Sequence, residues 1–208
     1  MQSVSEGEGM KKIAITGSIG SGKSTVSQYL RSRGFYVADS DAIVKDLYQQ
    51  DNRLKARFVE WFGESIILNG EVDKRRLKQL FLEDQHNRKK VETYVHQRVK
   101  ERLFDFMDQH SESAVVFCEV PLLFEVNWQH EFDETWLVVT SRDVLIKRLQ
   151  SYRGMSLEAI EHMLMWQMSV EDKIAKADVV IENQGSLERL YELVDQLVDK
   201  EGERNDCS

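Results

Sequence analysis

The chain has 208 residues, of which 41% are hydrophobic and 31% charged, and its formal net charge at pH 7 is −8. These values fit one globular domain with an inserted or flanking subdomain. The acidic balance argues against a general nucleic-acid-binding protein, which needs an excess of Lys and Arg. No apolar run approaches the length of a membrane-spanning helix. We therefore expect neither a nucleic-acid partner nor a membrane partner.

The two cysteines, Cys118 and Cys207, have neither the spacing of a metal site nor that of a disulfide framework. A reduced, cytoplasmic setting is the simplest account of this usage. Both ends of the chain are polar. We expect residues 1–9 to form a disordered extension, residues 10–200 a folded domain, and residues 201–208 a polar tail.

The first expected strand, Ile13–Ile15, leads into a glycine-rich segment and then into an expected helix over Thr25–Arg33. The segment matches G-x-x-x-x-G-K-S, in which glycines let successive backbone N–H groups point at phosphate oxygens. The following helix presents its positive dipole end to the same anion. In such a loop the lysine, Lys23, reaches the β- and γ-phosphates, and the Ser24 hydroxyl binds Mg²⁺. The predicted nucleotide site comprises Gly17, Ser18, Ile19, Gly20, Ser21, Gly22, Lys23, Ser24 and Thr25.

Four further runs of β-type residues follow, separated by helical stretches: 35–38, 114–118, 135–139 and 179–181. Strands that alternate with helices predict an α/β fold, with a parallel sheet of about five strands and helices on both faces. Ligands of such sheets bind beyond the carboxyl ends of the strands. The loops that follow the strands should therefore carry the chemistry.

The sequence between the second and third strands is mainly helical. Apolar residues recur at three- and four-residue steps over Arg53–Phe62 and Asp73–Gln109, and Ser65–Leu68 is a weak strand candidate. We predict a helical insertion over about residues 42–110 and a lid over about residues 150–170.

Asp39 and Asp41 come directly after the second expected strand, at the edge of the sheet that also holds the glycine-rich segment. A carboxylate there can accept the proton of an attacking hydroxyl or hold Mg²⁺ through water. The alternative is that one of them caps the helix that starts near Ala42. Both roles fit, one for each residue.

Glu119 ends the third expected strand, where proteins with this loop often place a carboxylate near Mg²⁺, although a structural role fits equally well. Asn183 follows the last strand, where it contacts the adenine of a nucleotide or forms a turn. These two residues extend the candidate site to the ends of two more strands.

Two arginines, Arg148 just before the predicted lid and Arg153 within its start, flank the segment that ends at residues 154–156. An arginine over the phosphates excludes water and neutralises transition-state charge. We assign this role to Arg153. The alternative is that the segment is simply the solvent-facing side of a helix, which carries Lys147 and Arg148. Ser156 and Ser169 are expected to cap the helices that follow.

Four motifs can be read together. T-G-x-I-G-S-G-K-S-T is met at residues 16–25, and D-A-D is met at 39–41 with serine in place of alanine. V-P-L-L-F-E is met in full at 120–125, and A-D-x-V-I-x-N-x-G at 177–185. Together they resemble the dephospho-CoA kinase family over nearly the whole folded chain. The last two motifs are specific, whereas the glycine-rich loop alone would not choose among kinases.

This resemblance implies an enzyme that uses Mg²⁺ and transfers the ATP γ-phosphoryl group to the 3′-hydroxyl of dephospho-CoA, the last step of coenzyme A synthesis. It implies that Asp41 is the base, that Arg153 is the lid arginine and that Asn183 belongs to the ATP pocket. The helical insertion would hold dephospho-CoA, with substrate contacts at Asp41, His96 and Leu123. Mg²⁺ would bind Ser24, with Asp39 or Glu119 acting through water.

The sequence departs from the family pattern in two places. The usual H-P-x-I-R is His96-Gln97-Arg98-Val99-Lys100 here, so the proline is lost and lysine replaces arginine. The interval from Arg148 to Arg153 is one residue longer than usual. Gln167 matches a glutamine that the family carries on the helix after the lid.

Two alternatives stay open at this point. One is another small-molecule kinase with the same loop, acting on a nucleoside monophosphate or a sugar acid. The other is a nucleotide-driven switch. A GTPase switch would need the guanine-selecting motif N-K-x-D, which the sequence lacks.

Overall fold

The computed structural model describes residues 9–206, and the chain divides into two compact units. We call residues up to Ala38 and from Met107 the sheet unit, and Asp39–Phe106 the helical unit. The expected extension over residues 1–9 lies, apart from its last residue, outside the described residues. Within the described chain, no helix has both the length and the apolar character needed to cross a bilayer.

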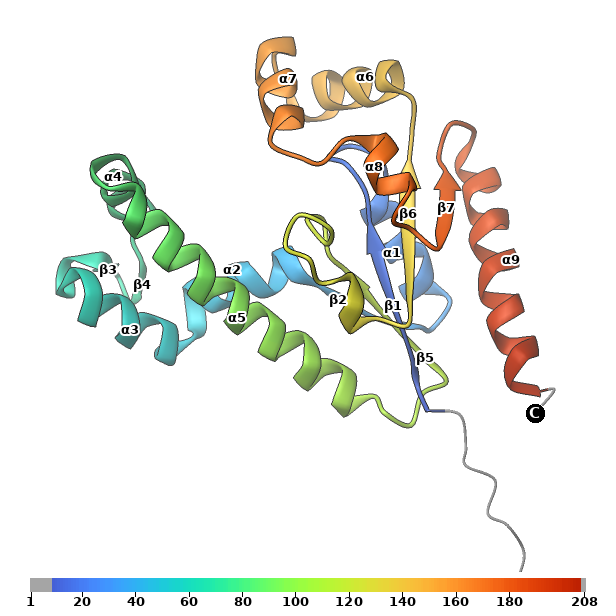
Figure 1. Cartoon of the computed structure of the whole chain (residues 1–208), viewed down its shortest axis with the longest axis horizontal. Coiled ribbons are helices and arrows are strands. Elements are labelled where there is room, and N and C mark those ends of the chain that lie inside the picture. Colours follow the sequence, from blue (N-terminus) through green and yellow to red (C-terminus); the bar gives the residue numbers. More distant parts are fainter. Residues whose placement is uncertain (1–8, 207–208) are drawn as a thin grey trace, which may run out of the picture. The chain divides into compact units, whose positions relative to one another are not determined.

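A parallel five-stranded sheet with strand order β2-β5-β1-β6-β7 forms the centre of the sheet unit (Figure 1). The central strand β1 pairs in parallel with both β5 and β6, so that Ile13 lies opposite Phe117 and Glu134. All five predicted strands are confirmed, to within two residues at each end. The strands are β1 (Lys11–Thr16), β2 (Tyr36–Asp39), β5 (Val115–Glu119), β6 (Glu134–Val139) and β7 (Val179–Glu182).

Two helices pack on one face of this sheet. Ile13 and Ile15 of β1 share a buried core with α1 (Lys23–Ser32) and α9 (Leu187–Asp206). Because α9 runs to Asp206, residues 201–206 are helical, whereas we expected a polar tail there; residues 207–208 lie outside the described chain.

The remaining helices of the sheet unit are η2 (Gln129–Glu131), α6 (Arg142–Arg153), α7 (Leu157–Met165) and α8 (Val170–Ile174). The predicted caps are confirmed: the Ser156 hydroxyl accepts a hydrogen bond from Ala159 N–H, and the Ser169 hydroxyl accepts one from Asp172 N–H. Each cap satisfies an N–H group that the first turn of a helix leaves without a partner.

The helical unit consists of α2 (Ser40–Gln50), α3 (Asn52–Phe62), η1 (Glu64–Ile66), β3 (Ile67–Leu68), β4 (Glu71–Val72), α4 (Lys74–Glu83) and all but the last turn of α5 (Gln85–Gln109). The helical pattern predicted over residues 73–109 is two helices. They separate at Asp84, which is extended and whose carboxylate accepts a hydrogen bond from His86 N–H. Asp84 thus ends α4 and caps α5, because its side chain replaces a missing helical acceptor.

A short hairpin explains the weak strand candidate at residues 65–68. β3 and β4 are antiparallel and are joined by Asn69 and Gly70, both with positive φ, 52° and 80°. Asn-Gly is the usual sequence for a two-residue hairpin turn of this kind. The Asn-Gly pair therefore indicates this hairpin more clearly than the short apolar run beside it does.

One buried ion pair holds α5 to the start of α3. Asp51 caps α3 by accepting from Leu54 N–H, and its second oxygen lies 2.7 Å from Arg98 Nη2 on α5. Burial works against ionisation of Asp51, but the hydrogen bonds from Arg98 and Leu54 outweigh it and lower the pKa of this carboxyl. The side chain of Asp51 is only 3% exposed, so its charge depends on this partner.

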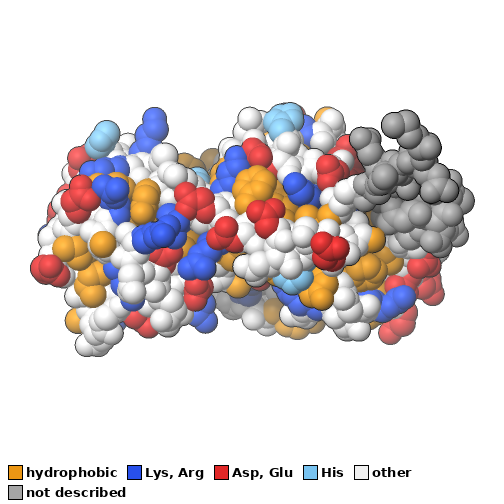
Figure 2. Space-filling view, turned by 90° about the horizontal axis from the view of Figure 1, so that it is seen from below, with side chains coloured by type: hydrophobic (Ala, Val, Ile, Leu, Met, Phe, Trp, Pro, Cys, Tyr) orange, Lys and Arg blue, Asp and Glu red, His pale blue; other side chains and the backbone are white. Residues whose placement is uncertain are grey.

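Charges of both signs lie interleaved on the face seen in Figure 2. Their distribution along the chain is uneven. Residues 39–106 contain 14 of the 28 Lys and Arg residues but only 13 of the 36 Asp and Glu residues. The helical unit is therefore close to neutral, and the net negative charge belongs to the rest of the chain.

Candidate functional site

Residues 17–22 form the turn that joins β1 to α1, and close contacts explain why glycine is needed at two of its positions. Gly22, at φ 106°, is the N-cap of α1, and a Cβ there would lie 2.1 Å from Asn183 Nδ2. A Cβ on Gly17 would lie 2.3 Å from the Val138 carbonyl oxygen. Gly22 offers no side-chain cap, so the first N–H groups of α1 remain available for an anion.

Lys23 opens α1 directly behind this turn and is 8% exposed. Its Nζ donates hydrogen bonds to the carbonyl oxygens of Gly17 at 2.9 Å and Ser18 at 3.0 Å. The ammonium group is therefore folded back over the loop that precedes it. Thr25 lies in the same first turn of α1, so the whole predicted segment is one structural feature.

The hydroxyl of Ser24 donates to Glu119 Oε1 at 2.9 Å, which links the start of α1 to the end of β5. Glu119 is 4% exposed, and its second oxygen has no hydrogen-bond partner within the described residues. A hydroxyl and a carboxylate are hard oxygen ligands of the kind that Mg²⁺ prefers. Among residues 9–206, no group of three or more His, Cys, Asp and Glu could hold a metal alone. A metal here would need water and phosphate oxygens as well.

Asn183 links the end of β7 to the glycine-rich loop. It is 4% exposed, and its side-chain amide donates to the Ser21 carbonyl oxygen at 2.8 Å. Arg148 of α6 contacts the same two residues, 3.4 Å from Ser21 O and 3.3 Å from Asn183 Oδ1. Arg148 is thus half-buried against the loop and is not part of a solvated helix face.

The other predicted residues of the sheet unit are placed differently. Arg153 is exposed in the last turn of α6, and Gly154 ends that helix in the left-handed region, at φ 61°. Leu123 is fully buried in the segment after β5, whereas its neighbour Leu122 is 41% exposed. The structure therefore brings Arg148, rather than Arg153, against the loop.

Asp39, Asp41 and His96 lie in the helical unit. Asp39 Oδ1 accepts hydrogen bonds from the N–H groups of Asp41 and Ala42, which is the capping role considered from sequence. Asp41 lies in the first turn of α2 with an exposed side chain, and His96 is half-buried on α5. Asp39 and Asp41 therefore differ in what they do: Asp39 caps α2, whereas the carboxylate of Asp41 is exposed.

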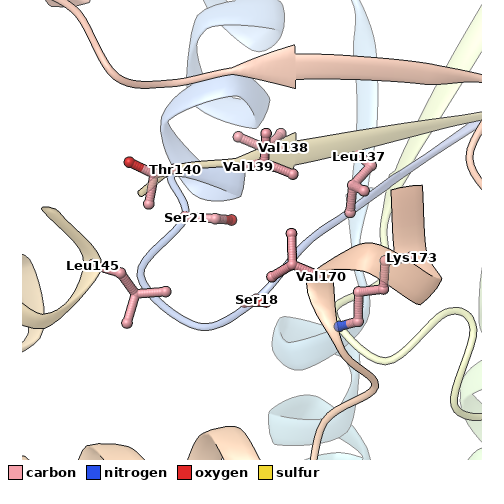
Figure 3. A pocket seen from close by; sticks show the side chains of 9 residues that line it. All are labelled: Ser18, Ser21, Leu137, Val138, Val139, Thr140, Leu145, Val170 and Lys173. Atoms are coloured by element: carbon pink, nitrogen blue, oxygen red, sulfur yellow. The ribbon is translucent and has the colours of Figure 1, made fainter. Parts of the chain in front are cut away.

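Sequence reasoning predicted no contact for three polar residues near the loop, although Gln167 was matched to a family glutamine. Gln167 Oε1 accepts from Ile19 N–H at 3.3 Å, and the fully buried Lys173 forms an ion pair with Glu125 at 2.9 Å. Lys173 lines a small cavity that also includes Ser18 and Ser21 (Figure 3). Glu125 was part of a quoted motif, but no spacing rule connects it with a lysine 48 positions later.

Comparison with known proteins gives a consistent result. The family model described as dephospho-CoA kinase matches residues 11–189. The dephospho-CoA kinase of Streptococcus mutans is 36% identical over 187 residues, which are 89% of this chain and 94% of that protein.

Solved structures agree on the fold. The crystal structure of TT1252 from Thermus thermophilus is 34% identical with a TM-score of 0.76, covering 92% of this chain and 97% of that one. The dephospho-CoA kinase from Campylobacter jejuni is 24% identical with a TM-score of 0.71, covering 93% and 98%. The second likeness supports the fold alone.

Proposed function

The chain belongs to the dephospho-CoA kinase family, and we propose that it transfers the γ-phosphoryl group of ATP to the 3′-hydroxyl of dephospho-CoA. It is an ATP-dependent kinase that acts on an alcohol group. The observation that carries the proposal is the glycine-rich loop before the uncapped start of α1, with Lys23 folded over it. Phosphoryl transfer depends mainly on positioning and on neutralisation of charge, and this loop supplies both.

Lys23 and the backbone N–H groups of the loop bind the triphosphate in this proposal. Ser24 and Glu119 would hold Mg²⁺ together with water, because the buried free oxygen of Glu119 fits a cation ligand. Asp39 is the alternative carboxylate acting through water. Bound with ATP, the ion supplies charge neutralisation at the phosphate oxygens. Arg148 and Asn183 would border the nucleotide, since both contact Ser21.

The acceptor side is assigned to the helical unit. Asp41 accepts the proton of the 3′-hydroxyl, and its exposed side chain in the first turn of α2 supports this role. The near-neutral helical unit, with half of all Lys and Arg residues, suits an acceptor that carries a diphosphate. His96 contacts the acceptor, and Leu123, being buried, acts by shaping the segment that carries the exposed Leu122.

Arg153 remains our candidate for the lid arginine over the transferring phosphoryl group. Its exposed place beside the left-handed Gly154 supports a side chain that can reach a bound nucleotide. An arginine in that position stabilises the charge that spreads over the phosphoryl oxygens. Arg148 would instead stay with the nucleotide, because it already contacts Asn183.

We place the reaction in the cytoplasm. Cys118 is free and fully buried, and burial raises the pKa of its thiol to about 12. A thiol with so high a pKa forms little thiolate and is inert towards oxidation. A free, buried cysteine of this kind fits a reduced compartment.

Acceptor-dependent ADP release tests the proposal. Purified protein is assayed with ATP and Mg²⁺ and with dephospho-CoA, AMP or gluconate as acceptor. We expect turnover with dephospho-CoA alone and a product phosphorylated at the 3′ position. Turnover with AMP or gluconate instead would favour the other small-molecule kinases. Nucleotide binding without turnover on any acceptor would favour a switch.

A further inference from the structure

The glycine-rich loop is held at Ile19 by two separate contacts from the same region. The Ile19 side chain packs against a small core formed by Leu145 and Leu149 of α6 and Ile160 of α7. Its backbone N–H donates to Gln167 Oε1 at 3.3 Å. Gln167 belongs to the segment between α7 and α8, residues 166–169, which we call the strap. The loop and the strap are therefore in direct contact.

The strap has a second anchor on its other side. Met168 N–H donates to Glu125 Oε1 at 2.9 Å, and the same oxygen lies 2.9 Å from Lys173 Nζ. Glu125 comes from the segment after β5, and Lys173 comes from α8. One carboxylate oxygen of Glu125 thus accepts a hydrogen bond from the strap backbone and also forms the ion pair with Lys173.

Lys173 is an unusual residue to find at this place, because its side chain is fully buried. It shares a cavity with Ser18 and Ser21 of the loop and with Val170 of its own helix (Figure 3). The Ser21 hydroxyl has no hydrogen-bond partner within the described part of the chain. Burial of an unpaired ammonium group is strongly unfavourable, so Lys173 needs the carboxylate of Glu125 beside it.

We propose that Glu125 and Lys173 are positioning residues for the phosphate-binding loop, which they hold in place through Met168, Gln167 and Ile19. This rests on the proposed function, because it assigns the loop to ATP. A buried ion pair adds little stability compared with apolar residues of similar size. Its value here is that the carboxylate oxygen of Glu125 fixes Met168, and the preceding residue, Gln167, bonds the loop. Loss of that oxygen lets Gln167 leave Ile19.

Two double variants separate this role from simple packing. Glu125→Gln with Lys173→Met removes both charges but keeps an oxygen for Met168 N–H. Glu125→Met with Lys173→Met also removes both charges and removes that oxygen. Calorimetric titration with ATP and Mg²⁺ should give a near-normal Kd for the first. For the second we expect a Kd raised about two- to tenfold, as for one lost hydrogen bond, with a similar melting temperature.

Two single variants complete the test. Gln167→Met removes the last bond directly and should raise the Kd for ATP by the same factor. Lys176→Met alters an exposed lysine three residues after Lys173 and should leave the Kd unchanged. In turnover, the positioning variants should raise KM for ATP more than they lower kcat.

Equal ATP affinity in both double variants would overturn the proposal. So would an equal loss in both together with lower melting temperatures, because that outcome marks a purely structural pair. If the Glu125→Met double variant does not fold, a normal Kd in Gln167→Met is sufficient to reject the idea. Because ATP affinity is measured without an acceptor, failure of the proposed transfer to dephospho-CoA would be seen separately, in the ADP-release assay.

Discussion

The glycine-rich loop and the helical unit are built on opposite principles. In the loop, backbone groups and a few buried polar side chains touch at short range: Gly22 leaves no room for a Cβ, and Asn183 and Lys23 bond to loop carbonyls. In the helical unit, amphipathic helices pack through rows of apolar residues such as Val91, Val95 and Val99. The loop tolerates no change of spacing, whereas a helix face tolerates many substitutions of similar size.

Because of this difference, the sequence of the loop indicates its function more directly than the sequence of the helical unit does. A loop that wraps a phosphate must point its backbone N–H groups at the oxygens. It therefore needs particular residue types at fixed spacings, which can be recognised in the sequence. A helical insertion binds its ligand with side chains chosen for one acceptor, and periodicity reveals only its buried face. We therefore expect changes in the loop to affect ATP binding, and changes in the helical unit to affect acceptor use or stability alone.

The largest effect is expected from Asp41, which belongs to the helical unit yet is assigned to the chemistry. Asp41→Ala should lower kcat by about 10²–10⁴-fold, the range for a lost general base, and leave the Kd for ATP unchanged. Asp46→Ala, an exposed carboxylate on the same helix, is the matched control. Steady-state kinetics and calorimetry measure the two quantities. A near-normal kcat in Asp41→Ala would remove its assigned role.

Lys23→Ala tests the loop side of the comparison. We expect kcat/KM for ATP to fall by about 10²–10³-fold, because a positioned charge at the phosphates is lost. Lys147→Ala, on an exposed position of α6, should show no such change. Circular dichroism should report an unchanged helix content for both. An equal drop in the two variants would mean that general charge, and not position, supports ATP binding.

The limits of sequence reasoning follow from the same contrast. The sheet strands and the loop were predictable because apolar runs and the G-x-x-x-x-G-K-S spacing are local signals. The split at Asp84 was not predicted, since no Gly or Pro marks it and the polar residues 83–90 also fit the exposed part of one helix, whereas the cap at Asp84 interrupts the backbone. Asp39 was correctly considered as a cap, because an acidic residue before a helix is also a local pattern.

The contacts around the loop could not be predicted for a different reason. The link from Gln167 to Ile19 and the pairing of Lys173 with Glu125 join residues far apart in the chain. Only the fold brings them together. Likewise, the sequence favoured Arg153 because Gly154 follows it, whereas the half-buried position of Arg148 on α6 is what brings that arginine to Ser21.

A change in stability without a change in ATP affinity is expected from Asp51→Asn. Asn keeps an oxygen for the α3 cap but removes the charge that Arg98 faces, at a cost of about 1.5–3 kcal/mol at pH 7. The folded-state pKa of Asp51 is lowered, so its stabilisation is present above the ordinary value near pH 4 and is lost as the pH falls through the lowered value.

Thermal denaturation over a pH series measures this. The difference in melting temperature between the original protein and Asp51→Asn should be largest near neutral pH and should shrink in acid below about pH 4. Glu60→Gln, which removes an exposed carboxylate of α3 that is paired with Arg57, is the control and should change little at any pH. A difference that does not depend on pH would mean that the Asp51 charge adds no stability.

The smallest expected effect comes from the β3–β4 turn, and it tests whether the helical unit and the glycine-rich loop act independently. Asn69 has φ 52° in the β3–β4 turn, so Asn69→Ala places alanine in the left-handed region at a cost of about 1 kcal/mol. Asn69→Gly should relieve that strain, and both effects should be visible as shifts of the urea midpoint. Since this turn lies in the helical unit, neither variant should change the Kd for ATP. If Asn69→Ala weakened ATP binding, the two regions would be coupled, and the separation of donor binding from acceptor binding would be wrong.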